Sequence, residues 1–223
     1  MMLRAARVGR RTAIGVLALA LGACGSLLET DMPVPTGYVI ASLPHGAVAA
    51  QQATQVDISI GRPDVAPGLD SDRIAALKGR QLDYYRAARW GGSTVETLQA
   101  FLVGSLEDQR LFRSVTPEQA RVAGDYVLDV EVRHFQAEYP AGGGAPDVHV
   151  HMTGRLIRVV DRQLVSTVVA EARAPAGEER LGLVVQAFET ATQQATKDLA
   201  TKLAEVVASD ALDLSRARGE QEP

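Results

Sequence analysis

The stretch that decides the fold is YVLDVEVRHFQAEYPAGGGAPDVHVHMTGRLIRVVDRQLVSTVVAEA, residues 126–172. It contains three segments of strand character, at residues 126–135, 148–160 and 164–172. A loop rich in glycine and proline separates the first two, and the tripeptide at residues 161–163 separates the last two. Because short connections join neighbouring strands in opposite directions, the pattern predicts an antiparallel meander of three strands.

Two amphipathic helices are predicted on either side of this meander in the sequence. The first lies within GGSTVETLQAFLVGSLEDQRLF, residues 91–112, where Ser93 and Glu96 form a capping-box pattern that satisfies unpaired amides of the first turn. The second runs from Glu178 to about Ser209. Both carry apolar residues at spacings of three and four, so each should bury one face against a sheet. These apolar residues are Val95, Leu98, Phe101, Leu102 and Leu106, then Leu181, Val184, Val185, Phe188, Ala191, Ala195, Leu199, Leu203 and Val206.

Further strands are predicted before the first helix. Residues 54–61 alternate apolar and polar side chains, which is typical of a half-buried strand, and residues 73–86 form a hairpin pattern around Gly79. The fold class predicted for residues 38–209 is therefore a single α/β domain. Its β-sheet is mixed, largely antiparallel, and packed against the two main amphipathic helices. Residues 210–223 end without apolar anchors and are expected to be a disordered tail.

The charge distribution excludes one class of partner. The chain has 223 residues and a formal net charge of −4, but four of its 23 basic residues lie within the first eleven positions. Without them the balance is 19 basic against 27 acidic residues, a net of −8. Nucleic-acid binding needs clustered Lys and Arg that displace counterions from phosphates, so we expect no nucleic-acid partner.

The N-terminus has the layout of a secretory signal peptide, with arginines, then an apolar run from Ala13 to Leu21, then small residues. As a helix, these nine apolar residues would extend about 14 Å, which is too short to span a hydrocarbon core of about 30 Å. An uncleaved membrane anchor extending to Leu28 is the alternative. We predict a signal peptide at residues 1–23 and a tether, which contains Pro33 and Pro35, at residues 24–37.

The chain's single cysteine follows this signal. The sequence Leu21-Gly22-Ala23-Cys24 resembles the lipobox of bacterial lipoproteins. That resemblance implies cleavage between Ala23 and Cys24, a diacylglyceryl group on the thiol, and acylation of the new amino group by a chain such as palmitate. Several acyl chains together hold a protein firmly at a membrane. A chance cysteine in an ordinary signal peptide or buried helix is the alternative. Gly25 stands where an aspartate would retain the protein at the inner membrane, which favours the outer membrane, facing the periplasm.

The sequence contains no nucleophile elbow, phosphate-binding loop, dinucleotide fingerprint or zinc-protease helix. The best candidate for chemistry is the strand pattern DVHVH, in which Asp147, His149 and His151 share one face. Its histidines could share a metal ion, although the alternation of His134 groups it with Leu128, Val130 and Val132 on the opposite face. A solvated strand face explains the same pattern, so His149 and His151 are weak metal candidates. We expect no cofactor other than covalent lipid.

Trp90, the only tryptophan, stands just before the predicted helix cap. Two interpretations fit this position: a residue that packs in the core, or an exposed aromatic edge that docks to a partner.

The segment at residues 70–115 resembles the signature region of the ABC-type transport auxiliary lipoproteins, the PqiC- or YmbA-like family. The matching residues are Tyr84, Tyr85, Arg89, Trp90, Phe112 and Val115. The resemblance implies a non-enzymatic lipoprotein that works with an ABC permease and ATPase and with an MCE-domain protein to move phospholipid or other lipid across the cell envelope. Gly91, Gly92 and Ser93 depart from the acidic and proline residues that are more typical after the tryptophan.

The expected function is thus docking and anchoring at the outer membrane, with Tyr84, Tyr85, Arg89 and Trp90 as candidate docking or signature residues. A ring or other homo-oligomer would suit an MCE ring. The main alternative is an envelope lipoprotein that assembles or activates another machine, such as a secretion channel or a peptidoglycan synthase. A metalloenzyme that uses the histidine strand is the third hypothesis.

Overall fold

The structure is a computed structural model that describes residues 34–48, 53–122 and 124–219, without the side chains of residues 215–219. The chain divides into two units, Met1–Val34 and Pro35–Pro223. The signal peptide, Cys24 and most of the predicted tether lie outside the described residues.

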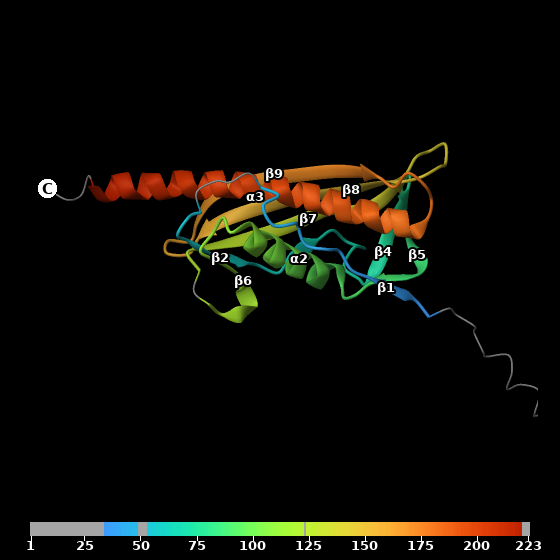
Figure 1. Cartoon of the computed structure of the whole chain (residues 1–223), viewed down its shortest axis with the longest axis horizontal. Coiled ribbons are helices and arrows are strands. Elements are labelled where there is room, and N and C mark those ends of the chain that lie inside the picture. The colour runs from blue at the N-terminus through green and yellow to red at the C-terminus, as the bar shows by residue number, and fades with distance from the viewer. Residues whose placement is uncertain (1–33, 49–52, 123, 220–223) are drawn as a thin grey trace, which may run out of the picture. The chain divides into compact units, whose positions relative to one another are not determined.

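The elements follow one another in chain order, as Figure 1 shows. They are β1 (Thr36–Tyr38), β2 (Asp57–Ile60), β3 (Asp64–Val65), β4 (Arg73–Lys78), β5 (Gln81–Trp90), α2 (Thr94–Gln109), β6 (Ser114–Pro117), the 3-10 helix η1 (Glu118–Ala120), β7 (Tyr126–Tyr139), β8 (Asp147–Arg158), β9 (Gln163–Pro175) and α3 (Leu181–Gly219).

The predicted meander is present, because β7 pairs antiparallel with β8 and β8 with β9 along nearly their whole lengths. The hairpin β4–β5 is antiparallel too, with Gly79 in its turn at φ 59°. The other edge of β7 differs from the prediction, since β2, β3 and β4 all pair with it in parallel. With the parallel pairs β1–β5 and β2–β6, the sheet is mixed rather than largely antiparallel. Strands β2 to β4 reach β7 through long crossovers, which permit parallel pairing.

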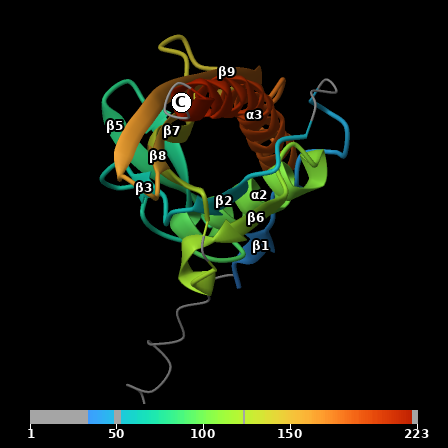
Figure 2. The ribbon, with the colours of Figure 1, turned by 90° about the vertical axis from the view of Figure 1, so that its left-hand side faces the viewer.

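Both predicted helices pack against this curled sheet (Figure 2). Ser93 caps α2 with a complete capping box: its hydroxyl accepts from the amide of Glu96, and the Glu96 carboxylate accepts from the amide of Ser93. Apolar residues of α2, α3 and the inner face of the sheet form one core, with Leu98, Leu128 and Leu199 all fully buried. No helix among the described residues is both long and apolar enough to span a bilayer.

Helix α3 ends later than predicted. It continues to Gly219, so the described part of the expected disordered tail, residues 210–219, is helical. A buried polar contact fixes this extension, because the carboxylate of Asp210 accepts from Arg158 Nη2 (2.5 Å) and from Tyr126 Oη (2.6 Å). The sequence pattern misses it because the anchor is a charged residue and not an apolar one.

Candidate functional site

A β-bulge in β7 changes which side chains face outward. Before it, Leu128, Val130 and Val132 point into the core; after it, Phe135 and Ala137 do. The register of β7 against β8 shifts between Val132 and His134. An extra residue in one strand reverses the alternation beyond it. His134 therefore leaves the face of Leu128, where simple alternation had placed it, and joins the outer face of the sheet.

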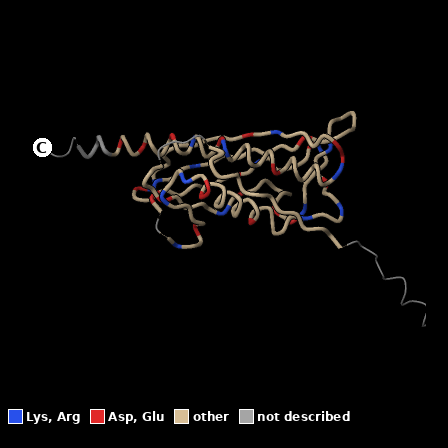
Figure 3. The backbone as a smooth tube through the Cα atoms, in the orientation of Figure 1, with Lys and Arg blue, Asp and Glu red and all other residues tan. Residues whose placement is uncertain are grey.

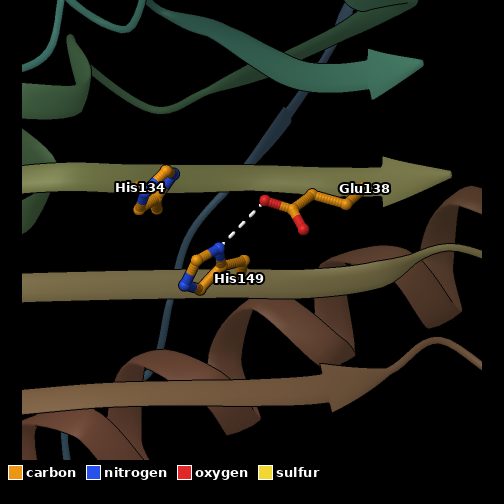
Figure 4. Close-up of side chains that lie close together, drawn as sticks. All are labelled: His134, Glu138 and His149. Atoms are coloured by element: carbon orange, nitrogen blue, oxygen red, sulfur yellow. Dashed lines mark hydrogen bonds and ion pairs between the residues drawn. The ribbon is translucent and has the colours of Figure 1, made fainter. Parts of the chain in front are cut away.

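Three side chains on this outer face form the candidate site (Figure 4). His134 and Glu138 come from β7, and His149 comes from the adjacent β8. The two imidazole rings stack with centroids 4.2 Å apart and an interplanar angle of 13°. His149 Nδ1 lies 2.9 Å from Glu138 Oε1. Their ligand atoms all lie within 4.8 Å of one another.

Strand β9 completes the network around His149. Glu171 Oε1 lies 2.8 Å from His149 Nε2, and Arg173 donates to Glu138 Oε2 at 2.6 Å. Only an imidazole with both nitrogens protonated can donate to both carboxylates. Arg173 Nη2 also lies 2.8 Å from His149 Nδ1, and it donates there only when that nitrogen carries no proton. The network therefore offers His149 two hydrogen-bonding arrangements, which differ by one proton.

The solvated strand face predicted for His149 was wrong. His149 is only 4 % exposed, since the neighbouring side chains of β7 and β9 cover it. His151 is half-buried, with its ring nearly perpendicular to that of His134, and its Nδ1 has no hydrogen-bond partner among the described residues. Asp147, the third residue of the sequence pattern, is exposed at the start of β8 and lies outside the group His134, Glu138 and His149.

The network shifts the ionisation of its members. Burial opposes ionisation of Glu138, but hydrogen bonds from Arg173, His149 and Gln136 outweigh it and lower the pKa of Glu138 to about 2. The hydrogen bond from His149 lowers the pKa of Glu171. Burial and the neighbouring His149 lower the pKa of His134, which also accepts a hydrogen bond at Nδ1 from the amide of Gln136 (2.9 Å). Glu138 is thus held ionised, and His134 is favoured in its neutral form.

The donor set does not fit a metal ion in this arrangement. Metal ligands need in-plane nitrogen lone pairs that converge on one point, whereas the stacked rings of His134 and His149 direct theirs in nearly parallel planes. The guanidinium of Arg173 also places a positive charge at His149 Nδ1, where it would oppose a cation. This geometry instead ties β7, β8 and β9 together through charged hydrogen bonds.

The signature residues lie in β5 and in or just before β6, and they differ in burial. Trp90 is 1 % exposed and packs against Phe135 (centroids 5.6 Å apart) and Phe188 (5.2 Å), so it is a core residue and not an exposed docking edge. Phe112 and Val115 are buried as well.

The remaining signature residues are accessible to some degree. Tyr84 donates to the carbonyl of Gly68 (2.8 Å), and Tyr85 and Tyr139 share a hydrogen bond between their hydroxyls (2.9 Å). Arg89 is exposed and pairs with Asp72 at 3.1 Å. Of the candidate docking residues, Tyr84, Tyr85 and Arg89 therefore retain surface that a partner could contact.

Sequence reasoning missed Glu138, Glu171 and Arg173. Alternation along β9 places Glu171 and Arg173 on an outward face, whereas Glu138 reaches the outer face only through the bulge in β7. The register of β7 against β8 and of β8 against β9 then brings all three to His149. Ala23 and Cys24, the predicted cleavage and lipidation residues, lie outside the described residues.

Comparison with known proteins gives a family and a fold. The family model described as "ABC-type transport auxiliary lipoprotein component" matches residues 38–200. The crystal structure of protein XCC0632 from Xanthomonas campestris, of the DUF330 family, has a TM-score of 0.70 at 23 % identity over 79 % of this chain and 99 % of that chain. A second crystal structure, of an uncharacterized protein, has a TM-score of 0.57 at 15 % identity and covers 75 % of this chain and 99 % of that chain. At these identities, the two structures show a shared fold. A search of curated proteins finds no match.

Proposed function

This chain belongs to the ABC-type transport auxiliary lipoprotein components, and from that premise we propose that it anchors and docks an MCE-type ABC transport system. In this proposal lipid on Cys24 holds the chain at the outer membrane, and the folded body binds the MCE-domain protein on the periplasmic side. The system it serves moves phospholipid or another lipid across the envelope. The chain acts by binding and geometry and catalyses no reaction.

The observation that carries the proposal is the extent of the family match. It begins at Tyr38, the last residue of β1, and ends within α3, so it takes in strands β2 to β9, the whole of α2 and the first part of α3. The body as a unit, and not one motif within it, is therefore what the family shares. The lipobox-like sequence that ends at Cys24 precedes this unit by a short segment, as an anchor should.

The anchor is tested with Cys24→Ser. Every buried hydrophobic residue of the described core follows residue 38, so this substitution should leave the fold intact. It removes the thiol that receives the diacylglyceryl group, and the protein should leave the membrane fraction. A matched substitution at Ser26, Ser26→Ala, should leave membrane association unchanged. Retention of the Cys24→Ser protein in the membrane would favour an uncleaved apolar helix instead.

The partner is tested by pull-down of the mature lipoprotein from detergent-solubilised envelope, with an unrelated outer-membrane lipoprotein as control. An MCE-domain or ABC component should be enriched over that control. If only components of a secretion channel or a peptidoglycan synthase were enriched, the transport role would fail and the alternative envelope role would replace it.

A non-enzymatic role also predicts the metal content of the purified protein. Elemental analysis after dialysis without chelator should find no stoichiometric zinc or copper. His45→Ala, at the histidine that lies on neither β7 nor β8, is the control for His149→Ala. Metal at one equivalent that disappears with His149→Ala alone would overturn this part of the proposal.

A further inference from the structure

The hairpin formed by β4 and β5 has the opposite charge to the chain as a whole. Residues 73–90 contain five basic side chains and one acidic side chain, a net of +4, whereas the whole chain has a net charge of −4. The tube in Figure 3 shows basic positions recurring along this hairpin. The basic residues are Arg73, Lys78, Arg80, Arg86 and Arg89, and all five are exposed.

The pairing of β4 with β5 contains a wide bulge, and two of the exposed arginines, Arg86 and Arg89, lie in or beside it. Arg73 pairs with Arg89 but Ala75 pairs with Tyr84, so β5 contains three more residues than β4 between these two pairs. Within this bulge Ala87 has a φ of 52°, a left-handed conformation that costs a residue other than glycine about 1 kcal/mol. Bulges change the direction of side chains, and here Arg86 and Arg89 are both exposed, one on either side of Ala87.

Aromatic residues accompany the basic ones. The Arg73 guanidinium lies over the ring of Tyr84, 3.8 Å from its centroid, and Lys78 Nζ lies 4.9 Å from the ring centroid of Tyr139. Tyr84 and Tyr85 are half-buried, so both retain some exposed surface on the hairpin. Tyrosine and basic residues together are typical of surfaces at the level of lipid headgroups.

Acidic neighbours offset only part of the charge. Asp72 pairs with Arg89, and Asp83, within the hairpin, accepts from the backbone amide of Tyr84. Glu179 lines the same hollow as Lys78. The exposed guanidinium groups of Arg73, Arg80 and Arg86 have no such acidic counterpart among the described ion pairs, which leaves the hairpin positive.

The hairpin also lies next to the strand through which the chain enters the body. Strand β1 pairs in parallel with β5, with Tyr38 opposite Trp90. Twelve peptide units separate Cys24 from Thr36, the first residue of β1, and a fully extended chain of that length spans at most about 43 Å. A bilayer that holds lipid on Cys24 is therefore within reach of the β4–β5 hairpin.

We propose that the β4–β5 hairpin binds the anionic phospholipid headgroups of the membrane that anchors Cys24, and so orients the body on that membrane. The arginines and Lys78 contact phosphate groups, and the tyrosines lie at the headgroup level. Because the charge is concentrated on one hairpin of an otherwise acidic protein, the rest of the body is repelled from the same surface. This inference rests on the lipid anchor of the proposed function but not on its MCE partner.

The test uses the mature chain from residue 24 with Cys24→Ser, which keeps every buried hydrophobic residue of the described core. Vesicles of phosphatidylcholine, with and without about one third phosphatidylglycerol, are mixed with the protein and floated. The protein should bind the anionic vesicles only, and raising the salt to 0.5 M should release it.

The variant Arg80→Gln with Arg86→Gln should bind the anionic vesicles about 30-fold more weakly. Each basic side chain near an anionic surface contributes about 1 kcal/mol, and two such contributions correspond to this change in affinity. Arg121→Gln with Arg162→Gln changes the net charge equally at exposed positions outside the hairpin, and should weaken binding less than threefold. Circular dichroism confirms that both variants are folded.

Equal binding to neutral vesicles, or equal weakening by the two double variants, would overturn the inference. If the hairpin variant kept its vesicle binding but no longer bound an acidic protein partner, the hairpin would have a protein-docking role in place of headgroup binding. Vesicle binding by the Cys24→Ser chain is measured without any transport component, so failure of the MCE partnership leaves this result unaffected.

Discussion

At the scale of single residues, His134 and Glu138 make the stability of the body depend on pH. The pKa of His134 lies below its ordinary value of 6.5, because burial and the adjacent His149 disfavour its charged form. The folded state therefore binds fewer protons than the unfolded state, and stability is lost as pH falls below about 6.5. The pKa of Glu138, about 2 against an ordinary 4.5, acts in the same direction, with its contribution lost as pH falls from 4.5 towards 2.

The substitution His134→Gln tests the first of these contributions. Glutamine cannot take up a proton between pH 7.5 and pH 5. The Tm of the variant should therefore fall less over this pH range than the Tm of the parent protein. At pH 7.5 the histidine is neutral in both states, and the comparison there isolates the cost of the substitution itself. Thermal unfolding followed by circular dichroism over this range measures the difference. Parallel Tm curves for the two proteins would show that His134 does not titrate as inferred.

The histidine cluster also shows what a residue pattern can and cannot predict. Alternation correctly placed His149 and His151 on one strand face. It failed for His134, because simple alternation was continued past the bulge, where the buried apolar positions change from even to odd numbers between Val132 and Phe135. Glu171 and Arg173 follow from the alternation of β9, but their contact with His149 depends on strand register, which no single strand encodes.

At the scale of elements, Gly154 permits the close approach of α3 to β8. A Cβ at this position would lie 3.1 Å from Leu128 Cδ1, 3.1 Å from Leu199 Cδ1 and 3.3 Å from Val168 Cγ2. These neighbours belong to β7, α3 and β9, so an added side chain would press on three elements at once.

Gly154→Val should therefore overpack the layer between helix and sheet. We expect it to destabilise the protein by about 2 kcal/mol, which corresponds to a Tm lower by about 4–8 °C. Gly142→Val is the matched control: it lies in the β7–β8 loop, and a Cβ there meets nothing within 4 Å. Differential scanning calorimetry compares the two, and an unchanged Tm for Gly154→Val would show that α3 packs less closely than described.

The C-terminal extension of α3 depends on Asp210. The side chains of Asp210 and Arg158 are only 10 % and 12 % exposed, and Tyr126 donates a third hydrogen bond to the same carboxylate. Without Asp210, the largely buried Arg158 keeps only the more exposed Asp161 as an ion-pair partner among the described residues. We therefore expect a cost at the lower end of the range for breaking a buried ion pair, about 3 kcal/mol.

Asp210→Ala should lower the free energy of unfolding by about 3 kcal/mol and increase amide exchange in the extension more than near Leu199. Asp198→Ala removes an exposed partner of Lys202 on the same helix and should cost about 0.5 kcal/mol or less. Urea titration and hydrogen exchange measure both effects. Equal losses for the two variants would mean that the Asp210 contact does not fix the helix end.

Elements with a strong local signal were predicted from sequence, and short ones were not. The capping box at Ser93 and the apolar stripe behind it placed α2 correctly, because both are encoded within one turn of helix. The strand β3 has two residues and β6 has four, too few to display a period. They form because long-range pairing with β7 and β2 supplies partners for their backbone groups.

At the scale of the whole molecule, β7 is the strand that makes the sheet mixed. It has 14 residues, pairs antiparallel with β8 along one edge, and pairs in parallel with three short strands along the other. The antiparallel half was predictable because its loops are short. The parallel half was not, since the order of strands joined by long crossovers is set by packing across the entire sheet.

This arrangement predicts that the body unfolds in one step. Trp90 on β5 contacts Phe135 on β7 and Phe188 on α3, so the only tryptophan reports on a junction of two distant parts of the sheet and the long helix. The buried hydrophobic residues of the described chain form one connected core from Leu43 to Val207, which leaves no second core that could persist alone. Urea unfolding followed by tryptophan emission and by far-ultraviolet circular dichroism should give coincident midpoints and slopes.

Trp90→Phe, monitored by circular dichroism, should keep a single transition at lower urea, because a smaller ring leaves a void beside Phe135 and Phe188. Two separated transitions in the parent protein would show that the antiparallel meander with α3 is stable without the parallel half of the sheet.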